Sequence, residues 1–123
     1  MIRALLLLPF LALAACGTNE TAAAKPEQVA ADAAGAAYAA CVDKAAAAVD
    51  LSADQPAALT DRALKACINQ RTALVEAVKL AGTSGGVDPM TARLVAERSV
   101  RLADSELRER ANTAIVRAKL KAS

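Results

Sequence analysis

The chain has 123 residues, enough for one small domain beyond a targeting segment and too few for two. Its formal net charge of +2 is close to neutral, so charge gives no argument for nucleic-acid binding. Histidine is absent, which removes the commonest zinc ligand and the usual general base of Ser-His and Cys-His catalytic pairs. We therefore predict no metal site, no cofactor and no enzymatic activity.

The N-terminal segment has the layout of a secretory signal peptide. Arg3 supplies a positive charge, an apolar run begins at Ala4, and small residues precede Cys16. The run is too short to span a bilayer as a helix of about 20 residues. We predict a signal peptide over residues 1–15. Two alternatives stay open: an ordinary secretory signal cleaved near Ala15, with the cysteine incidental, and an N-terminal anchor that is never cleaved.

The sequence Leu13-Ala14-Ala15-Cys16 resembles the lipobox of bacterial lipoproteins. The resemblance implies that a dedicated signal peptidase cuts before Cys16, whose sulfur carries a diacylglyceride and whose freed amine is acylated. Gly17 stands where many lipoproteins retained in the inner membrane carry aspartate. We therefore predict a lipid anchor in the cell envelope, at the periplasmic face of the outer membrane. Residues 16–26 are then the lipidated cysteine and a flexible tether.

The composition of the remaining chain predicts an all-α fold. Alanine dominates it, and Tyr38 is its only aromatic residue. Alanine is the strongest helix former, but its small side chain buries little apolar area. We expect a small, open three-helix bundle over residues 27–123, with a thin core that needs an additional link.

The first two helices are expected to form an antiparallel hairpin over residues 27–81. Turn-forming residues around Asp54 separate a helix over 27–50 from a second over 56–81. Both helices have apolar residues at three- and four-residue steps, which places these residues on one face. The two predicted stripes are Tyr38, Cys41, Val42, Ala45 and Val49, and Leu64, Cys67, Ile68, Leu74, Val75 and Val78.

Cys41 and Cys67 are predicted to form a disulfide that links the hairpin. They lie at equal sequence distance from Asp54, so an antiparallel hairpin places them at the same height, each on its apolar stripe. An oxidising envelope preserves such a bond, and a loop of this size gives roughly 3.5 kcal/mol of stabilisation. Without a C-x-x-C motif or a histidine, a reactive role is the less favoured reading.

The hairpin also resembles a pattern in small uncharacterised secreted proteins of proteobacteria. Tyr38-Ala39-Ala40-Cys41-Val42, followed by Ala63-Leu64-Lys65-Ala66-Cys67, carries the resemblance, which extends from Tyr38 to Leu74. It implies a helix with Tyr-x-x-Cys joined to a second cysteine-bearing helix, and it implies no activity.

Asp88 and Pro89 are predicted to open a third helix over residues 88–120, as its N-cap and first residue. We expect Gly82 to end the preceding helix and residues 82–86 to form a flexible connection. The helix either continues to about Lys119 or bends near Asn112. Its packed face is predicted to contain Ala92, Val95, Ala96, Ser99, Leu102, Ala103 and Leu107, with Arg93, Glu97, Arg98, Arg101, Asp104, Arg108 and Glu109 on the opposite, solvated side.

Four arginines are candidate binding residues. Arg93, Arg98 and Arg101 lie on the charged side of the third helix, where an acidic partner or lipid headgroups could bind, although a mixed face is more often only solvated. Arg71 interrupts the apolar stripe of the second helix. We expect it to reach the edge of the bundle or to pair with a carboxylate of the third helix.

These features predict a non-enzymatic envelope lipoprotein. Its helices would bind another protein or further copies of the same chain, and the membrane would be reached through the N-terminal lipid. The alternative is a regulator or inhibitor of a periplasmic enzyme, with the segment Thr83–Val87 as the only candidate contact loop.

Overall fold

The computed structural model describes residues 23–123, so the predicted signal peptide, Cys16 and most of the predicted tether lie outside it. The chain forms four helices: α1 (Pro26–Ala48), α2 (Pro56–Ala66), α3 (Ile68–Ser84) and α4 (Pro89–Ala122). No strand occurs between residues 23 and 123. The predicted all-α class is therefore confirmed.

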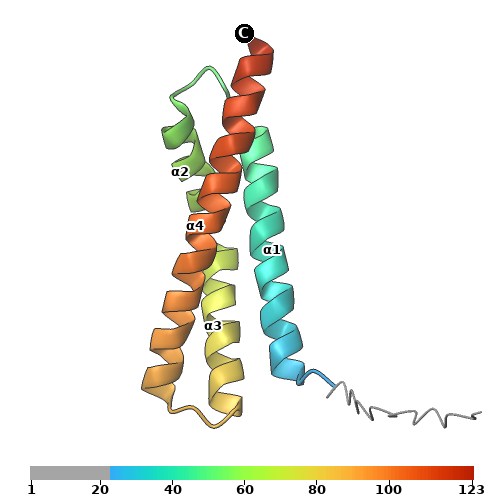
Figure 1. The fold of residues 1–123 in the computed structure, drawn as a ribbon, viewed down its shortest axis with the longest axis vertical. Coiled ribbons are helices and arrows are strands. Elements are labelled where there is room, and N and C mark those ends of the chain that lie inside the picture. Colours follow the sequence, from blue (N-terminus) through green and yellow to red (C-terminus); the bar gives the residue numbers. More distant parts are fainter. Residues whose placement is uncertain (1–22) are drawn as a thin grey trace, which may run out of the picture.

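The helices form an elongated bundle (Figure 1). α1 and α4 run in one direction, and α2 and α3 follow one another in the opposite direction, end to end along α4. The C-terminus and the α1–α2 connection lie at one end of the bundle. The start of α1 and the α3–α4 turn lie at the other end.

The prediction of a single helix over residues 56–81 is wrong, because the helix breaks at Cys67. The backbone of Cys67 has φ −105° and ψ 23°, and its N–H donates to the carbonyl of Leu64 at 3.1 Å. This bond spans three residues and tightens the chain locally. Ile68, predicted on the apolar stripe, is exposed because it begins α3 directly after the break, beside the packed face.

The turn between α3 and α4 is shorter than predicted. The helix continues past Gly82 to Ser84, and the reversal occurs at Gly85 and Gly86, where Gly86 has φ +91°. Gly82 has a different role, because a Cβ atom there would lie 3.2 Å from the Cβ of Ala92. The absence of a side chain at Gly82 lets α3 and α4 approach closely just before the turn.

α4 begins and continues as a single helix. The carboxylate of Asp88 accepts a hydrogen bond from the N–H of Thr91 at 3.0 Å, which confirms the predicted N-cap. The helix continues without a break through Asn112, whose side-chain oxygen lies 3.4 Å from the hydroxyl of Thr60 on α2. Tertiary contact thus offsets the low helix propensity there.

The packed face of α4 differs from the prediction. Val95, Ser99 and Leu102 are exposed. α4 has apolar residues on two faces, and the face with more alanines packs inward because alanine allows a closer approach of helices. The buried residues of α4 are Ala92, Ala96, Val100, Leu107, Ala111 and Ile115.

The predicted disulfide is present. Cys41 of α1 and Cys67 are bonded, with their Cα atoms 5.9 Å apart, and Cys67 is fully buried. Around the bond lie Tyr38, Val42 and Leu64, which belong to one continuous core cluster. The bond joins α1 to the chain at the break between α2 and α3.

We expect that replacing both cysteines, Cys41→Ala with Cys67→Ala, lowers the free energy of unfolding by about 3.5 kcal/mol, because the unfolded chain is no longer constrained. Chemical denaturation monitored by circular dichroism measures the change. Reduction of the unchanged protein is the control and should produce a similar loss. Equal stability of the reduced and oxidised proteins would contradict the prediction.

Candidate functional site

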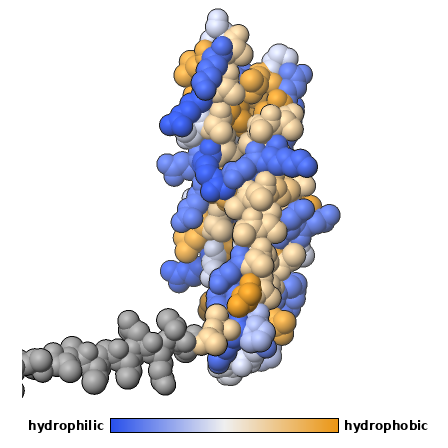
Figure 2. Space-filling view, turned by 90° about the vertical axis from the view of Figure 1, so that its right-hand side faces the viewer, coloured by the Kyte–Doolittle hydropathy of each residue, from blue (hydrophilic) through white to orange (hydrophobic). Residues whose placement is uncertain are grey.

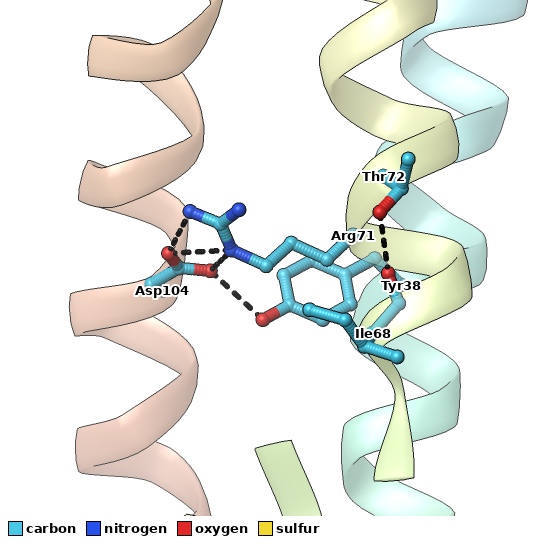
Figure 3. Close-up of polar contacts among 5 residues, drawn as sticks. All are labelled: Tyr38, Ile68, Arg71, Thr72 and Asp104. Atoms are coloured by element: carbon cyan, nitrogen blue, oxygen red, sulfur yellow. Dashed lines mark hydrogen bonds and ion pairs between the residues drawn. The ribbon is translucent and has the colours of Figure 1, made fainter. Parts of the chain in front are cut away.

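A polar cluster of Tyr38, Arg71 and Asp104 joins three helices inside the bundle (Figure 3). The tyrosine hydroxyl of α1 donates to a carboxylate oxygen of Asp104 on α4 at 2.8 Å. Arg71 of α3 reaches the same carboxylate, with its Nε 2.9 Å and its Nη2 2.7 Å from Oδ2. Tyr38 is 1% exposed, and the ion pair is partly buried. A single carboxylate therefore receives hydrogen bonds from two other helices.

The placement of Asp104 on the solvated side of the third helix is wrong. Asp104 follows Val100 by four residues and precedes Leu107 by three, so it lies on the packed face of α4. Arg71 pairs with it, which is one of the two outcomes that the sequence predicted for this arginine. The sequence pattern did not indicate this cluster, although a buried tyrosine hydroxyl needs a hydrogen-bond partner, and such a need could have indicated a polar group on the packed face of α4.

The environment favours a protonated tyrosine and a charged arginine. Burial, the hydrogen bond to Asp104 and the negative charge of that carboxylate raise the pKa of Tyr38 to about 12. The hydrogen bond to Asp104 raises the pKa of Arg71, against the opposing effect of burial. At neutral pH the cluster holds a neutral hydroxyl and a compensated ion pair. It is suited to holding helices together rather than to proton transfer.

α4 also has a polar link to each of the other parts of the bundle. Arg110 forms two hydrogen bonds, both 2.9 Å, with the carboxylate of Asp43 on α1. Arg108 pairs with Asp61 on α2. Near the C-terminus, Lys119 donates to the backbone carbonyl of Asp54 in the α1–α2 connection at 2.7 Å. Each of these contacts is individually weak, and they supplement the bonds to Asp104 in holding α4 against the other helices.

The predicted binding arginines fall into two groups. Arg71 is taken up by the cluster, and Arg93 pairs with Glu97 on the same helix at 3.0 Å. Arg98 and Arg101 are exposed, and within residues 23–123 neither has a carboxylate at ion-pair distance. A shallow groove of about 330 Å³ brings two of the four together, lined by Arg71, Thr72, Val75, Glu97 and Arg101.

The side of α4 turned away from the other helices has apolar residues next to these unpaired cations. Val95 and Leu102 lie seven residues apart, which places them on the same side of the helix, and Leu102 is 63% exposed. Arg98 and Arg101 lie between them in sequence. We name Val95, Arg98 and Leu102, together with Arg101 at their edge beside the groove to α3, the outward face of α4.

Residues 23–123 contain no group of three or more acidic or cysteine side chains that could hold a metal ion. In this range no helix is long and apolar enough to cross a membrane. Comparison with protein-family models, with curated proteins and with solved structures finds no match.

Because Tyr38 is the only tyrosine of the chain, its ionisation can be followed by ultraviolet absorbance of tyrosinate. We expect a midpoint near pH 12 in the folded protein and near the ordinary value of about 10 in concentrated urea. The folded state therefore binds the proton more tightly. This tighter binding of the proton stabilises the folded state. The stabilisation is complete below about pH 10 and is lost as the pH rises toward 12.

The variant Asp104→Asn should lower the folded-state midpoint toward the ordinary value, because the acceptor loses its negative charge. Asp43→Asn, which removes an exposed carboxylate paired with Arg110, is the matched control and should leave the midpoint unchanged. An unchanged midpoint in Asp104→Asn would contradict the role given to this carboxylate.

Proposed function

We propose that the chain is a non-enzymatic lipoprotein of the bacterial cell envelope that binds another protein through the outward face of α4. The observation that carries the binding role is this face itself. Val95 and Leu102 are exposed apolar residues, and Arg98 and Arg101 beside them lack acidic partners in the described part of the chain. An apolar patch with adjacent arginines is typical of protein-binding surfaces. The complementary partner surface is apolar and acidic.

The proposed location in the cell envelope has two sources of support. The sequence Leu13–Cys16 has the spacing of a lipobox, although it lies outside the described residues. The bond between Cys41 and Cys67 is compatible with an oxidising compartment such as the periplasm. On this proposal Cys16 carries the lipid, and the bundle lies on the periplasmic side of the outer membrane.

The anchor is tested by the intact mass of the protein extracted from membranes of a bacterium that processes lipoproteins. We expect a chain that begins at Cys16, is heavier by the mass of the attached lipid, and partitions into detergent. The variant Cys16→Ser should stay unlipidated. A wild-type chain that begins at another residue, or that carries no lipid, would overturn the lipoprotein proposal.

The binding role is tested with a photo-crosslinking amino acid at position 102 in living cells. We expect an adduct with a second protein, and position 120 is the matched control because Leu120 is 71% exposed on the same helix. Reversal of charge, Arg98→Glu with Arg101→Glu, should reduce the adduct by about tenfold, since it places like charges at the interface. Equal adducts at both positions, or an adduct unaffected by charge reversal, would contradict the role. An adduct of twice the chain mass would identify self-association.

A further inference from the structure

Exposed apolar side chains gather at one end of the bundle. We name this region the turn end and define it by Val29 of α1, Leu80 of α3, Val87 of the α3–α4 turn, and Met90 and Leu94 of α4. All five are exposed; Met90 is 75% and Leu94 60% accessible. In Figure 2, a few apolar side chains reach the surface near this end, among hydrophilic ones and close to where the described chain begins. Such a concentration of exposed apolar residues marks an interaction surface.

The turn end is the part of the bundle where the N-terminal segment is attached. The start of α1 and the α3–α4 turn lie at the same end of the molecule (Figure 1). Cys16 precedes Pro26 by ten residues, and ten residues span at most about 35 Å. An anchor at Cys16 therefore keeps this end near the bilayer, whereas the C-terminal end of α4 lies about 45 Å further along the helix from Met90.

The charge distribution at the turn end favours an apolar contact. Residues 80–87 contain no charged side chain. The charges that flank this segment in the sequence are Lys79, which pairs with Glu76, and Asp88. The carboxylate of Asp88 accepts the N–H of Thr91 at the start of α4. Lys25, Glu27 and Asp88 at the same end are exposed or half-buried, so they can stay hydrated among the headgroups while the apolar side chains reach the acyl-chain boundary.

We propose that the turn end rests on the phospholipid surface and holds the bundle upright on the membrane. This inference rests on the proposed lipid anchor at Cys16. The anchor supplies a high local concentration of bilayer, so a contact made by a few apolar side chains becomes populated. Because the contact is apolar, it requires no anionic lipid and is insensitive to salt, unlike adsorption through basic residues.

In the test a lipid is attached to Cys16 chemically, so that the outcome does not depend on lipidation by a cell. The chain from Cys16 to Ser123 retains all four helices. With the Cys41–Cys67 disulfide intact, the thiol of Cys16 is the only one free to couple to a maleimide lipid in phosphatidylcholine vesicles. The chain has no tryptophan, so Met90→Trp introduces a single reporter, and Leu120→Trp at the opposite end is the matched control.

We expect the fluorescence of the Met90→Trp protein to shift to the blue on coupling and to be quenched by brominated acyl chains, in low and high salt alike. The Leu120→Trp protein should show neither change. Within the Met90→Trp protein, Leu94→Asp should reduce the quenching. Leu102→Asp, a change of the same residue type at similar exposure further along α4, should not. Circular dichroism verifies that each variant is folded.

Three results would overturn the proposal: no quenching at position 90, equal quenching at both positions, or quenching that requires anionic lipid and disappears in salt. The last result would indicate electrostatic adsorption. Failure of native lipidation is measured separately by the mass of the membrane-extracted protein, so the two failures are distinguishable.

Discussion

The position of α4 depends on the hydrogen bonds that the carboxylate of Asp104 accepts. This carboxylate accepts hydrogen bonds from Tyr38 of α1 and Arg71 of α3 and thereby joins three helices at one point. The rest of the α4 interface includes three buried alanines, whose small side chains interlock weakly with neighbouring helices. A slip of α4 by one turn would move Asp104 by about 5 Å, beyond the reach of both donors. Directional bonds thus select one register where an alanine-rich contact would tolerate several.

The packing of α4 also determines which of its residues face the solvent. With Ala92, Ala96 and Val100 packed inward, Val95 and Leu102 are left on the outer side next to Arg98. The proposed binding surface is therefore the side of α4 opposite its packed face. In the same way, the close approach of α3 and α4 at Gly82 and the reversal at Gly86 bring Leu80, Val87 and Met90 to one end.

The sequence predicted those features that depend on local chemistry or on symmetry about a turn. Asp88 and Pro89 indicate the start of a helix, as its N-cap and first residue. The equal spacing of Cys41 and Cys67 from Asp54 places the two cysteines opposite one another in a hairpin. Both predictions are confirmed. The expectation of a helical hairpin followed by a long helix also holds, except that the second helix is divided at Cys67.

The main errors occur in α4, where the alanines do not indicate which face of the helix is buried. Alanine is compatible with a buried or an exposed position, so the sequence pattern assigns the packed face of α4 from Val95 and Leu102, which are exposed. The same pattern groups Asp104 with the solvated charges, since its two partners belong to helices distant in sequence. The break at Cys67 has no proline or glycine to mark it and arises from the tertiary arrangement. Predictions about residues 1–22 lie outside the described chain.

The central claim, that Asp104 fixes α4 by accepting from two helices, is tested most directly by a double-mutant cycle of Tyr38→Phe and Asp104→Ala. Chemical denaturation gives the free energy of unfolding for the four proteins. Tyr38→Phe is expected to lower the free energy of unfolding by about 1 kcal/mol when Asp104 is present. Almost no loss is expected when Asp104 is absent, because the hydroxyl has then lost its acceptor. An equal cost in both backgrounds would contradict the claim.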